Sequence, residues 1–208
     1  MIAWDEPADW KGAGEAAKRN GYELDVHGSN PEMGATDKTG KDEFEKALKT
    51  SDVVIYVGHG IGNSDNVPYV PTYIVIGGNT AYGSGGSGVP SGAEYYPTGP
   101  KPEVTAPVFG NFSCNSNANT SAFFTFKSKG QQFTVTVDSG EDGYTAVGTL
   151  ENAAKAFVQA YASTKGTTEA KVAAGTAAAN KIIEADRNRK FGHNHVGDKV
   201  VAEPVKPQ

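Results

Sequence analysis

The chain has 208 residues, a formal net charge of −5 and an apolar fraction of 38%, which is typical of one soluble domain with its own core. Its 19 basic residues are not gathered into a patch that suits nucleic acid, so we expect no nucleic-acid partner. The single cysteine excludes an intramolecular disulfide, and no run of eighteen apolar residues predicts a membrane span.

The start of the chain lacks the charged and apolar segments of a secretion signal, which predicts a cytoplasmic protein without a membrane partner. The abrupt opening, MIAWDEPADW, also fits an excised domain of a longer protein, whose other parts would then decide its location. A structural zinc site needs more cysteines than the chain has, and no metal or other cofactor is expected.

The first part of the chain alternates apolar strands with amphipathic helices. Strands are predicted at 2–4 and 22–27, and helices at 11–20 and 41–50. The segment 52–57, DVVIYV, is almost continuously apolar, which is the pattern of a strand covered on both faces of a parallel sheet.

The second part contains a long loop, several strands and two clear helices. Strands are predicted at 71–76, 106–112, 121–127 and 132–137, and helices at 150–162 and 168–186. Residues 77–101 are rich in glycine without periodicity and are predicted to be a loop beside the functional crevice. Residues 1–190 are thus one α/β domain with a mostly parallel sheet, and 191–208 are predicted to be a tail.

Two strands end in residues that carry chemistry. The strand at 52–57 runs into Gly58-His59-Gly60, and the strand at 106–112 runs into Ser113-Cys114. In open α/β sheets, ligands bind beyond the carboxyl ends of the strands. If the two strands are neighbours, a thiol and an imidazole meet there, which is the minimal set of groups for thiol nucleophilic catalysis.

These two motifs resemble the caspase/gingipain clan of cysteine peptidases, in which the histidine precedes the cysteine by about 50 residues. VVIYVGHG is similar to the histidine strand, and FGNFSCNSNA to the cysteine strand, of the bacterial CHAT, clostripain and gingipain-like members. The resemblance covers roughly residues 1–185, although the Gln-Ala-Cys-Arg-Gly signature of caspases is absent. It implies a three-layer α/β/α sandwich and an endopeptidase that acts on proteins or peptides.

The resemblance also implies roles for individual residues. Cys114 would attack the scissile carbonyl, and His59 would activate the thiol and protonate the leaving amine. The backbone N–H groups of Gly60 and Cys114 would form the oxyanion hole. The alternative is a caspase-fold interaction module that is catalytically silent or regulated by a partner.

Three further residues are candidates with weaker support. Phe112 lies two residues before Cys114, where caspases have Gln and metacaspases often have Asp, so it is a substrate-contact candidate that would not select charge. Asp5 follows the first strand and would recognise a basic substrate side chain. His27 also precedes a glycine at a strand end and is the rival of His59.

Overall fold

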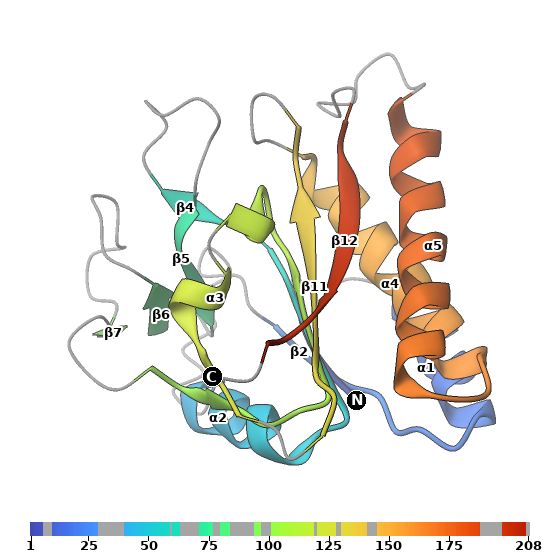
Figure 1. Cartoon of the computed structure of the whole chain (residues 1–208), viewed down its shortest axis with the longest axis horizontal. Coiled ribbons are helices and arrows are strands. Elements are labelled where there is room, and N and C mark those ends of the chain that lie inside the picture. The colour runs from blue at the N-terminus through green and yellow to red at the C-terminus, as the bar shows by residue number, and fades with distance from the viewer. Residues whose placement is uncertain are drawn as a thin grey trace.

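The computed structural model describes residues 1–5, 10–28, 40–58, 60–62, 71–76, 80–83, 94–96, 101–118, 120–127, 130–140, 145–187 and 197–206. Its centre is a six-stranded sheet with the order β12-β11-β9-β3-β1-β2 (Figure 1). The strands are β1 (Ile2–Asp5), β2 (Asp25–Gly28), β3 (Val53–Val57), β9 (Val108–Phe112), β11 (Phe133–Asp138) and β12 (Lys199–Pro204). Neighbouring strands are parallel, except that the edge strand β12 runs antiparallel to β11.

Helices cover both faces of this sheet (Figure 1). One face packs against α1 (Lys11–Arg19), α4 (Val147–Ser163) and α5 (Thr168–Arg187). The other face packs against α2 (Gly40–Thr50), the short α3 (Thr120–Phe123) and part of a smaller sheet. No helix within the described ranges is long and apolar enough to cross a membrane. The expected α/β architecture with a mostly parallel sheet is confirmed at this level.

Strand β3 shows why its sequence is apolar at every position. Val53, Ile55 and Val57 belong to the core on the side of α1, α4 and α5, whereas Val54 and Tyr56 belong to the core on the side of α2. All five side chains are buried. Because successive side chains of a strand point to opposite faces, a strand between two helical layers must be apolar on both.

Two small sheets lie beside the central one, and all their strands except β10 come from the segment between β3 and β9. The first contains β4 (Ile61–Gly62), β5 (Pro71–Ile76), β6 (Thr80–Gly83) and β7 (Glu94–Tyr96) in that order. The second pairs β8 (Glu103–Val104) with β10 (Thr125–Phe126). The 3₁₀ turn η2 (Ser116–Ala118) follows the cysteine.

Three expectations about elements are wrong in part. Within the predicted loop 77–101, β6 and β7 form strands, and Tyr82 is buried against Phe44 and Phe124. The predicted strand 121–127 is instead α3 followed by the two-residue β10. In the predicted tail, Lys199–Pro204 pairs with all of β11 as β12. The segments β6, β7, α3 and β10 are too short to show a hydrophobic period, and β12 lacks an alternating pattern, so long-range contacts decide their structure.

The chain order of the strands locates the crevice of the sheet. From β1 the chain moves outward to β2, then returns past β1 to β3 and continues in the opposite direction to β9 and β11. The direction therefore reverses between β1 and β3. In open α/β sheets, such a switch point at the carboxyl ends of the strands is where ligands bind.

Candidate active site at the carboxyl edge of the sheet

The two strands that carry the histidine and cysteine motifs are neighbours. β3 and β9 pair in parallel register from Val53↔Val108 to Val57↔Phe112, and the pairing continues into a bond of 3.3 Å from Gly58 N–H to the Phe112 carbonyl. Cys114 follows Phe112 by two residues, and His59 follows Val57 by two. His59 itself lies outside the described residues. The structure therefore brings together the strand ends that precede the two residues.

The thiol of Cys114 is nearly enclosed, with 7% of the residue exposed, and it packs in the core on the side of α4. Its Sγ lies 3.2 Å from the Thr145 carbonyl oxygen and 3.5 Å from the Thr145 amide nitrogen. As a thiol, it donates to the carbonyl; as a thiolate, it accepts from the amide. Thr145 precedes Ala146, the N-cap of α4, and the positive end of a helix favours a nearby thiolate.

A tight turn holds the chain directly after Cys114. Asn115 has φ 47°, the one positive φ outside glycine among the described residues. The Ser116 amide bonds to the Ser113 carbonyl, and the Ser116 hydroxyl joins the Asn111 carbonyl at 2.6 Å to the Val137 amide at 2.8 Å. Asn tolerates the left-handed region better than most residues. Such conformations persist where the surroundings enforce them, and they cluster at functional sites.

Buried polar side chains fix the end of β9 on the opposite face of the sheet. Asn111 is fully buried; its amide donates to the Thr120 hydroxyl at 2.9 Å and accepts from the Ser113 hydroxyl at 2.7 Å. The Thr120 hydroxyl in turn donates to the Ser116 carbonyl at 2.7 Å. Because breaking a buried hydrogen bond leaves groups unsatisfied, this network holds the cysteine turn firmly.

The two glycines beside His59 occupy different surroundings. A Cβ on Gly58 would lie 2.8 Å from the hydroxyl oxygen of Tyr56, so Gly58 leaves room for a side chain of its own strand. Gly60 is buried between β3 and β4, at the carboxyl edge. Gly58 therefore has a packing role of its own, separate from the expected role of Gly60.

The two candidates for substrate contact differ in outcome. Phe112 is fully buried and packs edge-on against Phe157 of α4, with ring centroids 5.9 Å apart. Its ring belongs to the core, so the expectation of substrate contact is corrected. Asp5 ends β1, beside the switch point of the sheet, but its side chain lies outside the described residues.

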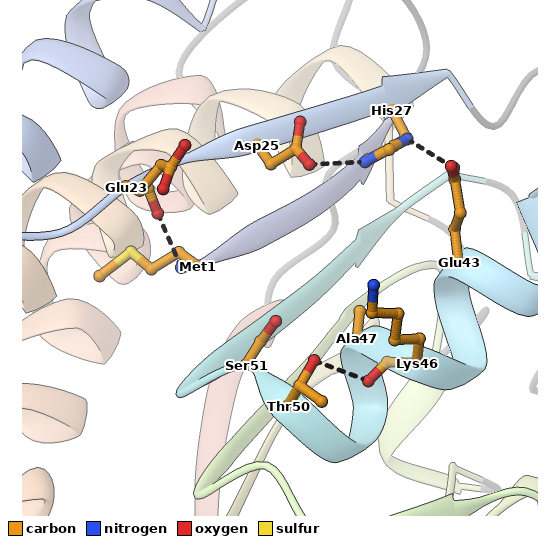
Figure 2. Close-up of a pocket in the computed structure, with 9 residues that line it drawn as sticks. All are labelled: Met1, Glu23, Asp25, His27, Glu43, Lys46, Ala47, Thr50 and Ser51. Atoms are coloured by element: carbon orange, nitrogen blue, oxygen red, sulfur yellow. Dashed lines mark hydrogen bonds and ion pairs between the residues drawn. The ribbon is translucent and has the colours of Figure 1, made fainter.

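The rival histidine, His27, lies on β2, three strands from β9, and Figure 2 shows its ring between Asp25 and Glu43. Its Nε2 is 3.0 Å from Asp25 Oδ2, and its Nδ1 is 3.4 Å from Glu43 Oε2, so both ring nitrogens face carboxylates. Since β1 and β3 lie between β2 and β9, His27 is about 14 Å from the facing part of β9 at about 4.8 Å per strand. His27 is therefore not a partner of Cys114.

A pocket next to His27 lies between β2 and α2 (Figure 2). Its lining includes Met1 and Ser51, which precede β1 and β3, whereas Cys114 follows β9. The lining is polar: it includes Glu23, Asp25, Glu43 and Lys46, of which Asp25 and Glu43 contact the histidine. In the described part of the chain, no group of three His, Cys, Asp or Glu side chains is arranged to hold a metal ion.

Sequence reasoning missed three residues that surround Cys114. Ser139 follows β11, Thr145 precedes α4 and Asp198 precedes β12, and all three are buried near the cysteine turn. Ser139 follows an apolar strand, as Cys114 does, so the same strand-end pattern predicts it. No comparable signal marks Asp198, because its strand was not recognised.

Comparisons with family models, with curated proteins and with solved structures found no match for this chain.

Proposed function

We propose that this protein is a cysteine endopeptidase with a caspase-like three-layer fold, in which Cys114 and His59 form the catalytic dyad. The observation that carries the proposal is the parallel pairing of β3 with β9 up to Val57↔Phe112. Two neighbouring parallel strands thus end together, at the edge where α/β sheets bind ligands. Each is followed, two residues later, by one half of the dyad.

The surroundings of Cys114 fit a nucleophile. The thiolate is the reactive form of cysteine, and hydrogen-bond donors and helix N-termini favour it. The Thr145 amide beside Sγ and the start of α4 supply both influences. The left-handed turn at Asn115 directs the chain away from the strand directly after the nucleophile.

In the proposed reaction, His59 takes the proton of Cys114, and the thiolate attacks the carbonyl carbon of the scissile peptide bond. The backbone N–H groups of Gly60 and Cys114 stabilise the oxyanion, at about 3 kcal/mol for a well-aligned donor. When the intermediate collapses, the C–N bond breaks and His59 returns the proton to the leaving amine. Water then hydrolyses the thioester. The proposed substrate is therefore a protein or peptide, with Asp5 as a candidate for binding a basic side chain.

The second candidate function is a catalytically silent or partner-regulated interaction module. The observation that favours it is the enclosure of Cys114, of which 7% is exposed and whose Sγ already contacts Thr145. An enclosed thiol reaches no substrate unless the edge of the sheet opens. The absence of the caspase signature around Cys114 points the same way.

Hydrolysis of a fluorogenic peptide library separates the two functions. We expect cleavage by the wild type, loss of cleavage to background in Cys114→Ala, and a loss of at least about 100-fold in His59→Ala. His27→Ala is the matched control, because His27 lies three strands from β9, and it should retain activity within about twofold of wild type. Cleavage that survives in Cys114→Ala, or no cleavage by any form, would refute the peptidase proposal.

A further inference from the structure

A chain of buried hydrogen bonds links Asn115 to Asp198. The Asn115 amide nitrogen is 2.9 Å from Ser139 Oγ, which is 2.7 Å from Thr145 Oγ1, which is 3.1 Å from Asp198 Oδ2. Ser139, Thr145 and Asp198 are all at most 3% exposed. This hydrogen-bond chain joins the cysteine turn to Ser139, which follows β11, to Thr145, which precedes the N-cap of α4, and to Asp198, which precedes β12.

The chemistry of these groups gives the chain one direction. A backbone N–H only donates, and an ionised carboxylate only accepts. With Asp198 ionised, Thr145 Oγ1 gives its single proton to Asp198, and Ser139 gives its proton to Thr145 and accepts from the backbone N–H of Asn115. Every hydroxyl proton is then assigned, and the carboxylate at the end fixes the orientation of both hydroxyls.

The same residues hold Cys114 from two sides. Asn115 directly follows the cysteine and adopts φ 47°, and the Thr145 backbone contacts Sγ through its carbonyl oxygen and its amide nitrogen. The chain thus ties the turn that carries the thiol to the amide that faces the thiol. If Thr145 moves, the N–H that would stabilise the thiolate moves with it.

We propose that Thr145 is a positioning residue for Cys114, held in place by Asp198 and Ser139, so that its amide remains directed at the sulfur when the thiol ionises. The inference rests on the proposed function for its catalytic meaning. The S–H proton passes to the base, and Sγ exchanges its role as donor to the Thr145 carbonyl for that of acceptor from the Thr145 amide. No other bond changes.

The carboxylate acts through its position and not through its charge. A negative charge near the sulfur disfavours the thiolate, so charge alone would work against the proposed role. Its contribution is the acceptor oxygen that fixes the Thr145 side chain. Asp198→Asn keeps such an oxygen and removes the charge, whereas Asp198→Ala removes both, so the two variants separate these effects.

The test measures the thiolate fraction of Cys114 directly. The chain has one cysteine, so the ultraviolet absorbance of the thiolate at a fixed pH, minus that of Cys114→Ser, reports this residue alone. Thr145→Val keeps the shape of threonine but interrupts the chain of hydrogen bonds. We expect the thiolate-to-thiol ratio to fall about fivefold, which corresponds to one lost aligned hydrogen bond. Thr145→Ser restores the hydroxyl, and its ratio should lie within twofold of wild type.

Asp198→Ala and Ser139→Ala interrupt the chain of hydrogen bonds at other points and should also lower the thiolate-to-thiol ratio. Asp198→Asn should not lower it. All spectra are taken on protein shown to be folded by circular dichroism, and Ser139→Ala serves as the second variant if Thr145→Val does not fold. An unchanged ratio in the folded chain-breaking variants, or no restoration by Thr145→Ser, overturns the inference. Because no peptide is present, the result stands apart from the peptidase assay: a wild type that cleaves nothing refutes the proposed function but not the positioning of the thiol.

Discussion

Ser116→Ala removes the hydroxyl that fastens the cysteine turn to two strands. Ser116 is fully buried; its Oγ donates to the Asn111 carbonyl of β9 at 2.6 Å and accepts from the Val137 amide of β11 at 2.8 Å. The variant leaves one buried acceptor and one buried donor without this partner. Each such group costs about 1–3 kcal/mol, so for the two groups we expect a loss of about 2–6 kcal/mol in the free energy of unfolding.

For a chain of this length, 1 kcal/mol corresponds to about 2–4 °C in the melting midpoint, so Ser116→Ala should melt roughly 4–24 °C below wild type. Thermal unfolding followed by circular dichroism measures this shift. Ser121→Ala is the matched control, because Ser121 is exposed on α3, and it should change stability by no more than about 0.5 kcal/mol. A midpoint of Ser116→Ala within about 2 °C of wild type would show that this hydroxyl does not fasten the turn.

Two further predictions concern the helical layer behind the cysteine. Gly175→Ala would bring a Cβ within 2.6 Å of the buried Phe157 ring. Overpacking should outweigh the helix-propensity gain of about 1 kcal/mol and lower the free energy of unfolding by a net value of about 1–2 kcal/mol. Gly148→Ala, whose added Cβ has no atom within 4 Å, should not lower it, and a Gly175→Ala melting midpoint at or above that of wild type would contradict the packing argument. Burial, and then the charges of Tyr22 and Asp52, raise the pKa of Tyr161 above its ordinary value of 10.0. Because the unfolded chain loses this proton first, stability should fall as pH rises above about 10, and the fall between pH 8 and pH 11 should be smaller in Tyr161→Phe; equal falls would refute the assignment.

The long, periodic elements could be predicted from the sequence because the spacing of their apolar residues matches the face that they bury. The helix expected at 41–50 is α2, with Phe44, Ala47 and Leu48 buried as one face. The predicted helices 150–162 and 168–186 are α4 and α5. The continuous apolar run of β3 predicted its double burial. In each case local periodicity and tertiary burial agree.

The remaining parts depend on contacts between residues distant in the sequence. β12 lies in a segment without strand periodicity, and it forms because the edge of β11 offers six residues to pair with. Tyr82 reads as a loop residue, yet it fills a gap between Phe44 and Phe124. The motif at Cys114 could be recognised because its residues are adjacent in the sequence. Asp198 could not be assigned to the site, because it lies 53 positions from its partner Thr145.

Covalent capture of the nucleophile tests the dyad most directly. A peptidyl chloromethyl ketone alkylates a cysteine that is activated beside a bound peptide, and mass spectrometry of the digested protein identifies the modified residue. We predict one adduct, on Cys114, in the wild type and in His27→Ala, and at least about a 100-fold slower adduct formation in His59→Ala. Equal rates in the wild type and His59→Ala, or a wild type that remains unmodified, would contradict a Cys114–His59 dyad at this edge of the sheet.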